Sequence, residues 1–150
     1  METIEKSVEV LNDLIEINND RIKGFETATK DLGEGNQDLK NIFNEMTAQS
    51  RQNVQELSQS ANTGGNENDS STSGAIHRAW IEVKATFTGH SRESILAECE
   101  RGEDAIKKAY KEALSPNSGL SNEQEHMIAK QQEVIIASHD KIKFLRDHQA

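Results

Sequence analysis

Apolar residues recur at alternating steps of three and four in four long segments of the chain. This spacing places them on one face of a helix, so each segment is predicted to be an amphipathic helix. In the first segment, residues 3–32, the stripe consists of Ile4, Val8, Leu11, Ile15, Ile22 and Phe25, with Asn18 at the position between Ile15 and Ile22. In the second, residues 37–61, it consists of Leu39, Phe43, Met46, Ser50, Asn53 and Leu57.

The second half of the chain repeats the pattern. Ser91 and Ser121 are predicted to cap the third and fourth helices, and Ser121 with Gln124 resembles a capping box. A turn around Pro116 and Gly119 separates the two helices. The third stripe consists of Leu96, Cys99, Glu103, Ile106, Tyr110 and Ala113. The fourth consists of Ile128, Gln131, Ile135, Ser138, Ile142 and Leu145.

The connections predict how the helices are joined. Residues 33–36 form a short Gly-Glu-Gly-Asn turn, which makes the first two helices antiparallel neighbours. Residues 62–73 are rich in Gly, Asn and Ser and cannot bury enough apolar surface to become ordered. This segment is predicted to be a flexible crossover that reaches from one end of the bundle to the other.

A short amphipathic segment, residues 75–88, follows the crossover. Its apolar face consists of Ile76, Trp80, Val83 and Phe87. Burying one such side chain is worth roughly 1.5–3 kcal/mol, so this face is predicted to be covered. It is covered either across the end of its own bundle or against a second copy of the chain, which makes these four residues a candidate interface.

These elements predict an all-α protein, an antiparallel four-helix bundle of ferritin-like arrangement with a long crossover and one extra short helix. The 150 residues form one domain. Its parts are a hairpin at 3–61, the crossover at 62–73, the short helix at 75–88 and a second hairpin at 91–148.

Composition narrows the classes of function. The formal net charge of −9 repels phosphate backbones, so no nucleic-acid partner is predicted. No apolar run approaches the roughly 20 residues that span a bilayer, so no membrane partner is predicted either. Cys99 is the only cysteine, which excludes an intramolecular disulfide and fits a reducing compartment. With no features of a secretion signal at the first residues, the expected location is the cytoplasm.

Three stretches carry a family resemblance: LNDLIEINNDRIKGFE at residues 11–26, HRAW at 77–80 and ECERGED at 98–104. They resemble a family of uncharacterised bacterial four-helix-bundle proteins that is classed as ferritin-like and known as a domain of unknown function. The resemblance extends over nearly the whole chain. It implies the bundle fold and suggests an association with stress responses, and it brings no established activity.

The ferritin-like arrangement raises the hypothesis of a carboxylate-bridged di-iron centre. Such a centre needs one Glu from each of two helices and a Glu-x-x-His from each of the other two. The second helix has no histidine, and Asn18 stands where the first helix needs a Glu. The one Glu-x-x-His, Glu123 to His126, lies in the first turn of its helix, where acidic residues are ordinary capping residues. No cofactor is therefore predicted, with iron or another divalent metal as the alternative.

Glu103 is the one carboxylate on an inward stripe, and two interpretations of it are open. In the first, it belongs to a hydrogen-bonded polar layer with Asn18, Ser50 and Ser138, and with Gln131 as a further candidate. Glu103→Gln is then expected to leave stability unchanged or raised. In the second, Glu103 is a ligand of one metal ion, with His139 as its partner.

Two functions from different classes follow from these interpretations. The first is a non-enzymatic structural or stress-associated protein that works by self-association or by binding another protein. The second is a metal-binding or redox protein with a reduced site around Glu103. No catalytic residues are predicted, because no nucleophile, histidine and acid can be assembled into one set. The missing histidine on the second helix favours the first function.

Overall fold

The computed structural model describes residues 2–61, 91–116 and 118–148, which form four α-helices and no strand. The helices are α1 (Glu2–Asp31), α2 (Gln37–Ala61), α4 (Arg92–Ala113) and α5 (Asn122–Asp147). The predicted all-α four-helix bundle is confirmed. The crossover at 62–73 and the short helix at 75–88 lie outside the described residues, as do Ile76, Trp80, Val83 and Phe87.

The helix ends follow from local sequence. The Ser121 side chain accepts a hydrogen bond from the Gln124 amide, and the Gln124 side chain accepts one from the Ser121 amide, so the predicted capping box is confirmed. Ser91 caps α4 by accepting from the Ser94 amide. Gly33 and Gly35 have φ angles of 65° and 95° in the turn between α1 and α2, a conformation that favours glycine.

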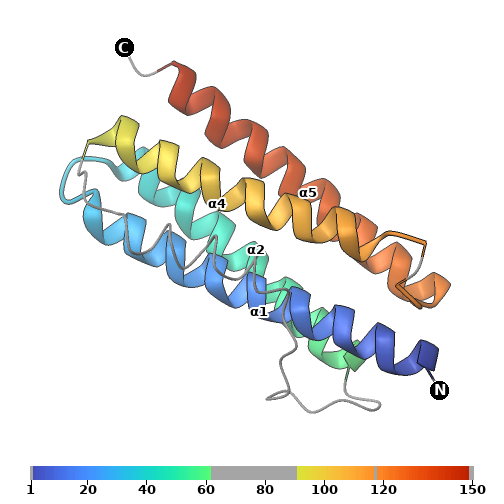
Figure 1. Ribbon diagram of the computed structural model, residues 1–150. Helices are drawn as coiled ribbons and strands as arrows, with labels where there is room; N and C mark the ends of the chain where they lie inside the picture. Colours follow the sequence, from blue (N-terminus) through green and yellow to red (C-terminus); the bar gives the residue numbers. More distant parts are fainter. Residues whose placement is uncertain (1, 62–90, 117, 149–150) are drawn as a thin grey trace.

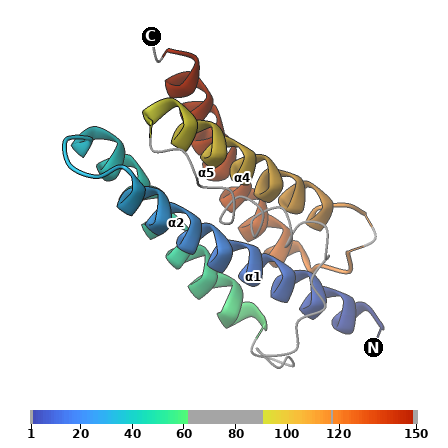
Figure 2. The same cartoon turned by 60° about the vertical axis from the view of Figure 1, so that its left-hand side comes forward.

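The four helices form two antiparallel hairpins that pack against each other. α1 pairs with α2 and α4 pairs with α5 (Figure 1). Between the hairpins, α1 packs closely on α4, whereas α2 and α5 make far fewer close approaches. α2 ends and α4 begins at opposite ends of the bundle, so α2 and α4 run in the same direction (Figures 1 and 2). A bundle with one long crossover has this arrangement.

The core is one continuous apolar cluster along the bundle axis. Phe25 and Phe43 join α1 to α2 with ring centroids 5.3 Å apart. Side chains without any exposed surface include Leu11, Phe25, Leu39, Phe43, Leu57, Ile95, Leu96, Ile106, Tyr110, Ile128, Ile135 and Ile142. These residues come from all four helices, so the hairpins are held together by burial of their apolar stripes. No described helix is long and apolar enough to cross a membrane.

Candidate functional site

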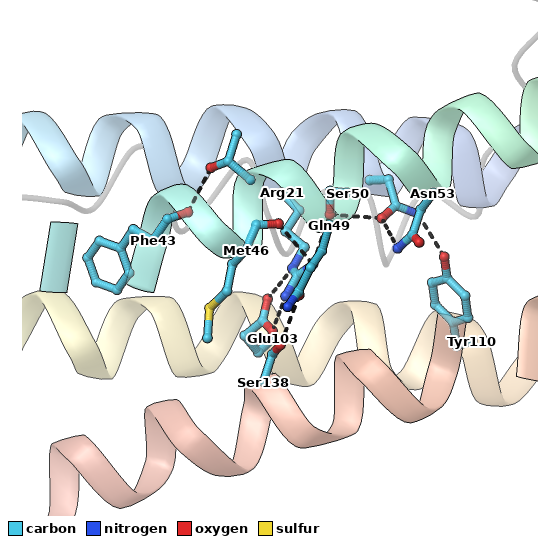
Figure 3. Close-up of polar contacts among 11 residues, drawn as sticks. Arg21, Phe43, Met46, Gln49, Ser50, Asn53, Glu103, Tyr110 and Ser138 are labelled. Carbon is cyan, nitrogen blue, oxygen red and sulfur yellow. Dashed lines mark hydrogen bonds and ion pairs between the residues drawn. The ribbon is translucent and has the colours of Figure 1, made fainter. Parts of the chain in front are cut away.

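An ion pair without solvent contact lies at the centre of the bundle. The Arg21 Nε atom of α1 donates to Glu103 Oε1 of α4 at 2.7 Å, and Arg21 Nη2 donates to Glu103 Oε2 at 2.9 Å. Both side chains are fully buried (Figure 3). The planar guanidinium matches both carboxylate oxygens at once, which is the strong bidentate form of this contact.

The Nη1 atom of the guanidinium also has partners within the protein. Arg21 Nη1 donates to the Ser50 hydroxyl at 2.9 Å and, more weakly, to the Met46 carbonyl at 3.4 Å, both on α2. The guanidinium carbon lies 5.4 Å from the centre of the Phe25 ring, within reach of a cation–π interaction. Arg21 therefore joins three helices: its own, α2 and α4.

Asn18 continues the polar contacts one turn away from Arg21. Its Oδ1 accepts from the Ser50 hydroxyl at 2.9 Å and from Asn53 Nδ2 at 3.2 Å. Its Nδ2 donates to the Tyr110 hydroxyl at 2.9 Å and to the Leu14 carbonyl at 2.8 Å. Asn18 has no exposed surface, and its amide makes four hydrogen bonds, its full capacity.

Tyr110 extends this hydrogen-bond network from Asn18 to α5. Its hydroxyl donates to Gln131 Oε1 at 2.7 Å, and Gln131 Nε2 donates in turn to Glu56 Oε1 on α2 at 2.8 Å. Burial raises the pKa of the Tyr110 hydroxyl, which keeps it a neutral donor. One chain of contacts thus runs from Glu103 through Arg21, Ser50, Asn18, Tyr110 and Gln131 to Glu56.

The chain matches a known protein family. Residues 6–116 fit the model of a family described as "Domain of unknown function (DUF2383)". The chain belongs to the DUF2383 family. The match contains Arg21, Glu103 and Tyr110, and it ends before α5 begins. No curated protein matches the chain.

In this DUF2383 member the predicted site residues separate into two groups. Asn18, Ser50 and Glu103 lie in the network around Arg21, and Gln131 lies at its far end. Ser138 instead donates to Gln49 Oε1 at 3.0 Å, on the side where α2 faces α5 (Figure 3).

His139 and Glu103, the two candidate metal ligands, have different partners. His139 Nε2 lies 2.6 Å from Asp104 Oδ1, and its Nδ1 lies 3.1 Å from Asp140 Oδ1. Glu103 is held by Arg21 through both oxygens. The positive charge that a metal would bring to Glu103 is supplied by the guanidinium. Among the described residues, no three His, Cys, Asp or Glu side chains are grouped to hold a metal ion.

Cys99 lies on α4, one turn before Glu103, and is buried. Burial is the main cause that raises the pKa of its thiol, and the nearby Glu103 carboxylate adds to the rise. The thiolate is the reactive form, so this cysteine behaves as a small apolar core residue.

Asp13 is a further perturbed group, on the flank of α1 away from the bundle centre. Its Oδ1 is buried and has no hydrogen-bond partner among the described residues. Burial, followed by the neighbouring charges of Glu9 and Glu16, raises the pKa of Asp13 to about 7. Asp13 therefore costs folding free energy when it is ionised, and the cost appears as the pH rises from about 4 to about 7.

Asp13→Asn is expected to stabilise the protein at pH 8 and to have little effect at pH 3. Below the unfolded pKa both states carry a protonated Asp13, whereas above pH 7 the wild type must ionise a partly buried group. Because the side chain is only partly buried, the expected gain at pH 8 is only about 1–2 kcal/mol. Urea unfolding at the two pH values measures it. Asp31→Asn, at the end of α1, controls for removal of one negative charge, and an equal gain from Asp13→Asn at both pH values would contradict the assignment.

Proposed function

We propose that this protein is a non-enzymatic helical bundle that works by binding another protein or a second copy of itself. The observation that carries the proposal is the Arg21–Glu103 pair. In a di-iron bundle the inward carboxylates are charge-balanced by metal. Here the inward carboxylate is balanced by an arginine of the same chain, so the bundle centre is a structural element.

The chemistry of the neighbouring residues supports the same proposal. Asn18, Ser50 and Asn53 are neutral and use their polar atoms on one another and on Tyr110. Neutral amides and hydroxyls cannot compensate the charge of two divalent ions. The direction of the four helices supports a ferritin-like arrangement in which a polar layer occupies the place of the metal centre.

The location and the cellular role of the protein are also part of what we propose. We propose a cytoplasmic bacterial protein with a role in stress responses, supported by the family resemblance of residues 11–26, 77–80 and 98–104. The single, buried Cys99 is compatible with a reducing compartment.

The proposal is tested by metal content and oxidase activity. Protein purified without chelators is expected to hold far less than one iron per chain by elemental analysis. It is also expected to consume no dioxygen beyond the buffer rate when Fe²⁺ is added. Glu123→Gln serves as a control, because Glu123 belongs to the exposed Glu-x-x-His of the first turn of α5. Stoichiometric metal that is lost in Glu103→Gln and kept in Glu123→Gln would overturn the proposal in favour of a metal-binding protein.

A further inference from the structure

A polar groove runs along the side of the bundle where α2 and α5 face each other. Two adjoining hollows of about 500 and 280 Å³ form it, and both are lined by Gln49 and Val134. Where the other neighbouring helices interlock apolar side chains, α2 and α5 are bridged by side-chain hydrogen bonds. These are Gln124 to Ser60 at 3.1 Å, Gln131 to Glu56 at 2.8 Å and Ser138 to Gln49 at 3.0 Å.

The two walls of this groove carry opposite charges at the same positions along the bundle axis. Glu45 of α2 and Lys141 of α5 line the smaller hollow, and Glu56 of α2 and Lys130 of α5 line the larger one. Within the described part of the chain, none of these four side chains forms an ion pair. Their four charges are thus not balanced by an ion pair among the described residues, although Glu56 also accepts hydrogen bonds from Gln131 at 2.8 Å and from Gln52 at 3.4 Å.

Apolar surface lies between the charged rows. Val134, with 42% of its surface exposed, lines both hollows, and Met127 and Ala137 line one each. Glu123 and His126 lie at the outer end of the groove, beyond the matched charges. A modest apolar centre with charged edges is the usual composition of a protein–protein contact of small area.

The positions of these charges favour one of two possible two-fold arrangements of two copies of the chain. A two-fold axis parallel to the helices would set α2 of one copy on α5 of the other at equal height, so Glu45 would face the second copy's Lys141, and Glu56 its Lys130. A two-fold axis across the helices would instead set α2 on α2 and bring like charges together. Isologous contacts need such a self-complementary surface.

We infer that the groove between α2 and α5 is a homodimer interface with its two-fold axis parallel to the helices. This inference rests on the proposed function and names the partner as a second copy of this chain. The groove extends over residues 123–141 of α5, which is about 27 Å of helix. Two helices that are each about 10 Å wide then bury about 1,100 Å² in total, at the lower end of specific interfaces, so the dimer is weak.

The inference is tested with a charge swap. The wild type is expected to form dimers at tens to hundreds of micromolar in sedimentation equilibrium. Lys130→Glu/Lys141→Glu and Glu45→Lys/Glu56→Lys are each expected to weaken the dimer by about tenfold or more, because every attractive contact becomes repulsive. An equimolar mixture of the two variants is expected to restore it. Circular dichroism confirms that both variants fold, and Lys108→Glu/Lys143→Glu controls for net charge.

Three results would overturn the inference. They are a wild type that is monomeric at every concentration, charge variants that dimerise as well as the control, and a mixture that does not restore the dimer. The metal measurement is independent of all three. A monomeric wild type with no metal would leave the proposed function standing, whereas a dimer with stoichiometric metal would remove only the proposed function.

Discussion

Glu103→Gln is expected to lower the free energy of unfolding by about 3–5 kcal/mol, the usual cost of breaking a buried ion pair by removing one partner. Gln has nearly the shape of Glu but no charge, so the Arg21 guanidinium would remain buried without its counter-ion. From the sequence alone the same substitution is expected to be neutral or stabilising, because an unpaired buried carboxylate is costly. The presence of Arg21 at 2.7 Å reverses the expected sign.

The measurement is urea unfolding of wild type and variant at one pH. Glu26→Gln is the matched control, because Glu26 of the same bundle pairs with Arg51 at 3.1 Å on the surface. Breaking an exposed pair of this kind costs at most about 1 kcal/mol. Equal effects of the two substitutions would show that the central pair is not buried in solution.

Asn18→Leu is expected to cost about 2–3 kcal/mol, although leucine fits the apolar stripe of α1 by size and pattern. Asn18 accepts from Ser50 and Asn53 and donates to Tyr110. Leucine would leave three buried polar groups one hydrogen bond short. Each such group costs about 1–3 kcal/mol, partly recovered where a second partner remains.

Tyr110→Phe tests the contribution of the Tyr110 hydroxyl separately from that of Asn18. It removes the bond from Asn18 and the bond to Gln131, and it leaves the contacts of Asn18 with Ser50 and Asn53 intact. The expected cost is about 1–2 kcal/mol, smaller than that of Asn18→Leu. A stabilising Asn18→Leu, measured by the same urea unfolding, would mean that the polar layer is not formed as described.

The fold could be predicted from sequence because its signals are local. Steps of three and four place Leu11, Phe25 and Leu39 on buried faces whatever the neighbouring helix supplies. Ser121 with Gln124 specifies a helix start through contacts only three residues apart. A short glycine turn at residues 33–36 fixes an antiparallel pair. None of these inferences requires knowledge of which residues meet between distant helices.

The site could be predicted only in part, because its decisive contact spans 82 residues of sequence. Asn18, Ser50 and Glu103 were identifiable as polar residues on apolar stripes. The predicted apolar stripe does not include Arg21, although a signal exists: Arg21 stands three residues after Asn18 and four before Phe25, on the buried face of α1. An arginine on the buried face of one helix and a carboxylate on the buried face of another form the pattern of an internal ion pair.

The contacts of His139 show that a periodic apolar pattern does not determine which neighbouring helix a side chain contacts. Its neighbour Ser138 lies on the predicted stripe, whereas His139 is turned toward Asp104 of α4. A rotation of one residue, 100° in a helix, decides whether a side chain faces the bundle axis or the seam between two helices. Sequence patterns locate helix ends and faces with an error of a few residues, which is too coarse to pair Glu103 with one particular group.

The most direct test is a double-mutant cycle across the central ion pair. Arg21→Met keeps much of the side-chain length and removes the charge, and Glu103→Gln removes the partner charge. Each single variant is expected to lose about 3–5 kcal/mol in urea unfolding, while the double variant loses little more than either one, giving a coupling of at least about 2–3 kcal/mol. Losses that simply add, with a coupling near zero, would contradict an interior held by Arg21 and Glu103.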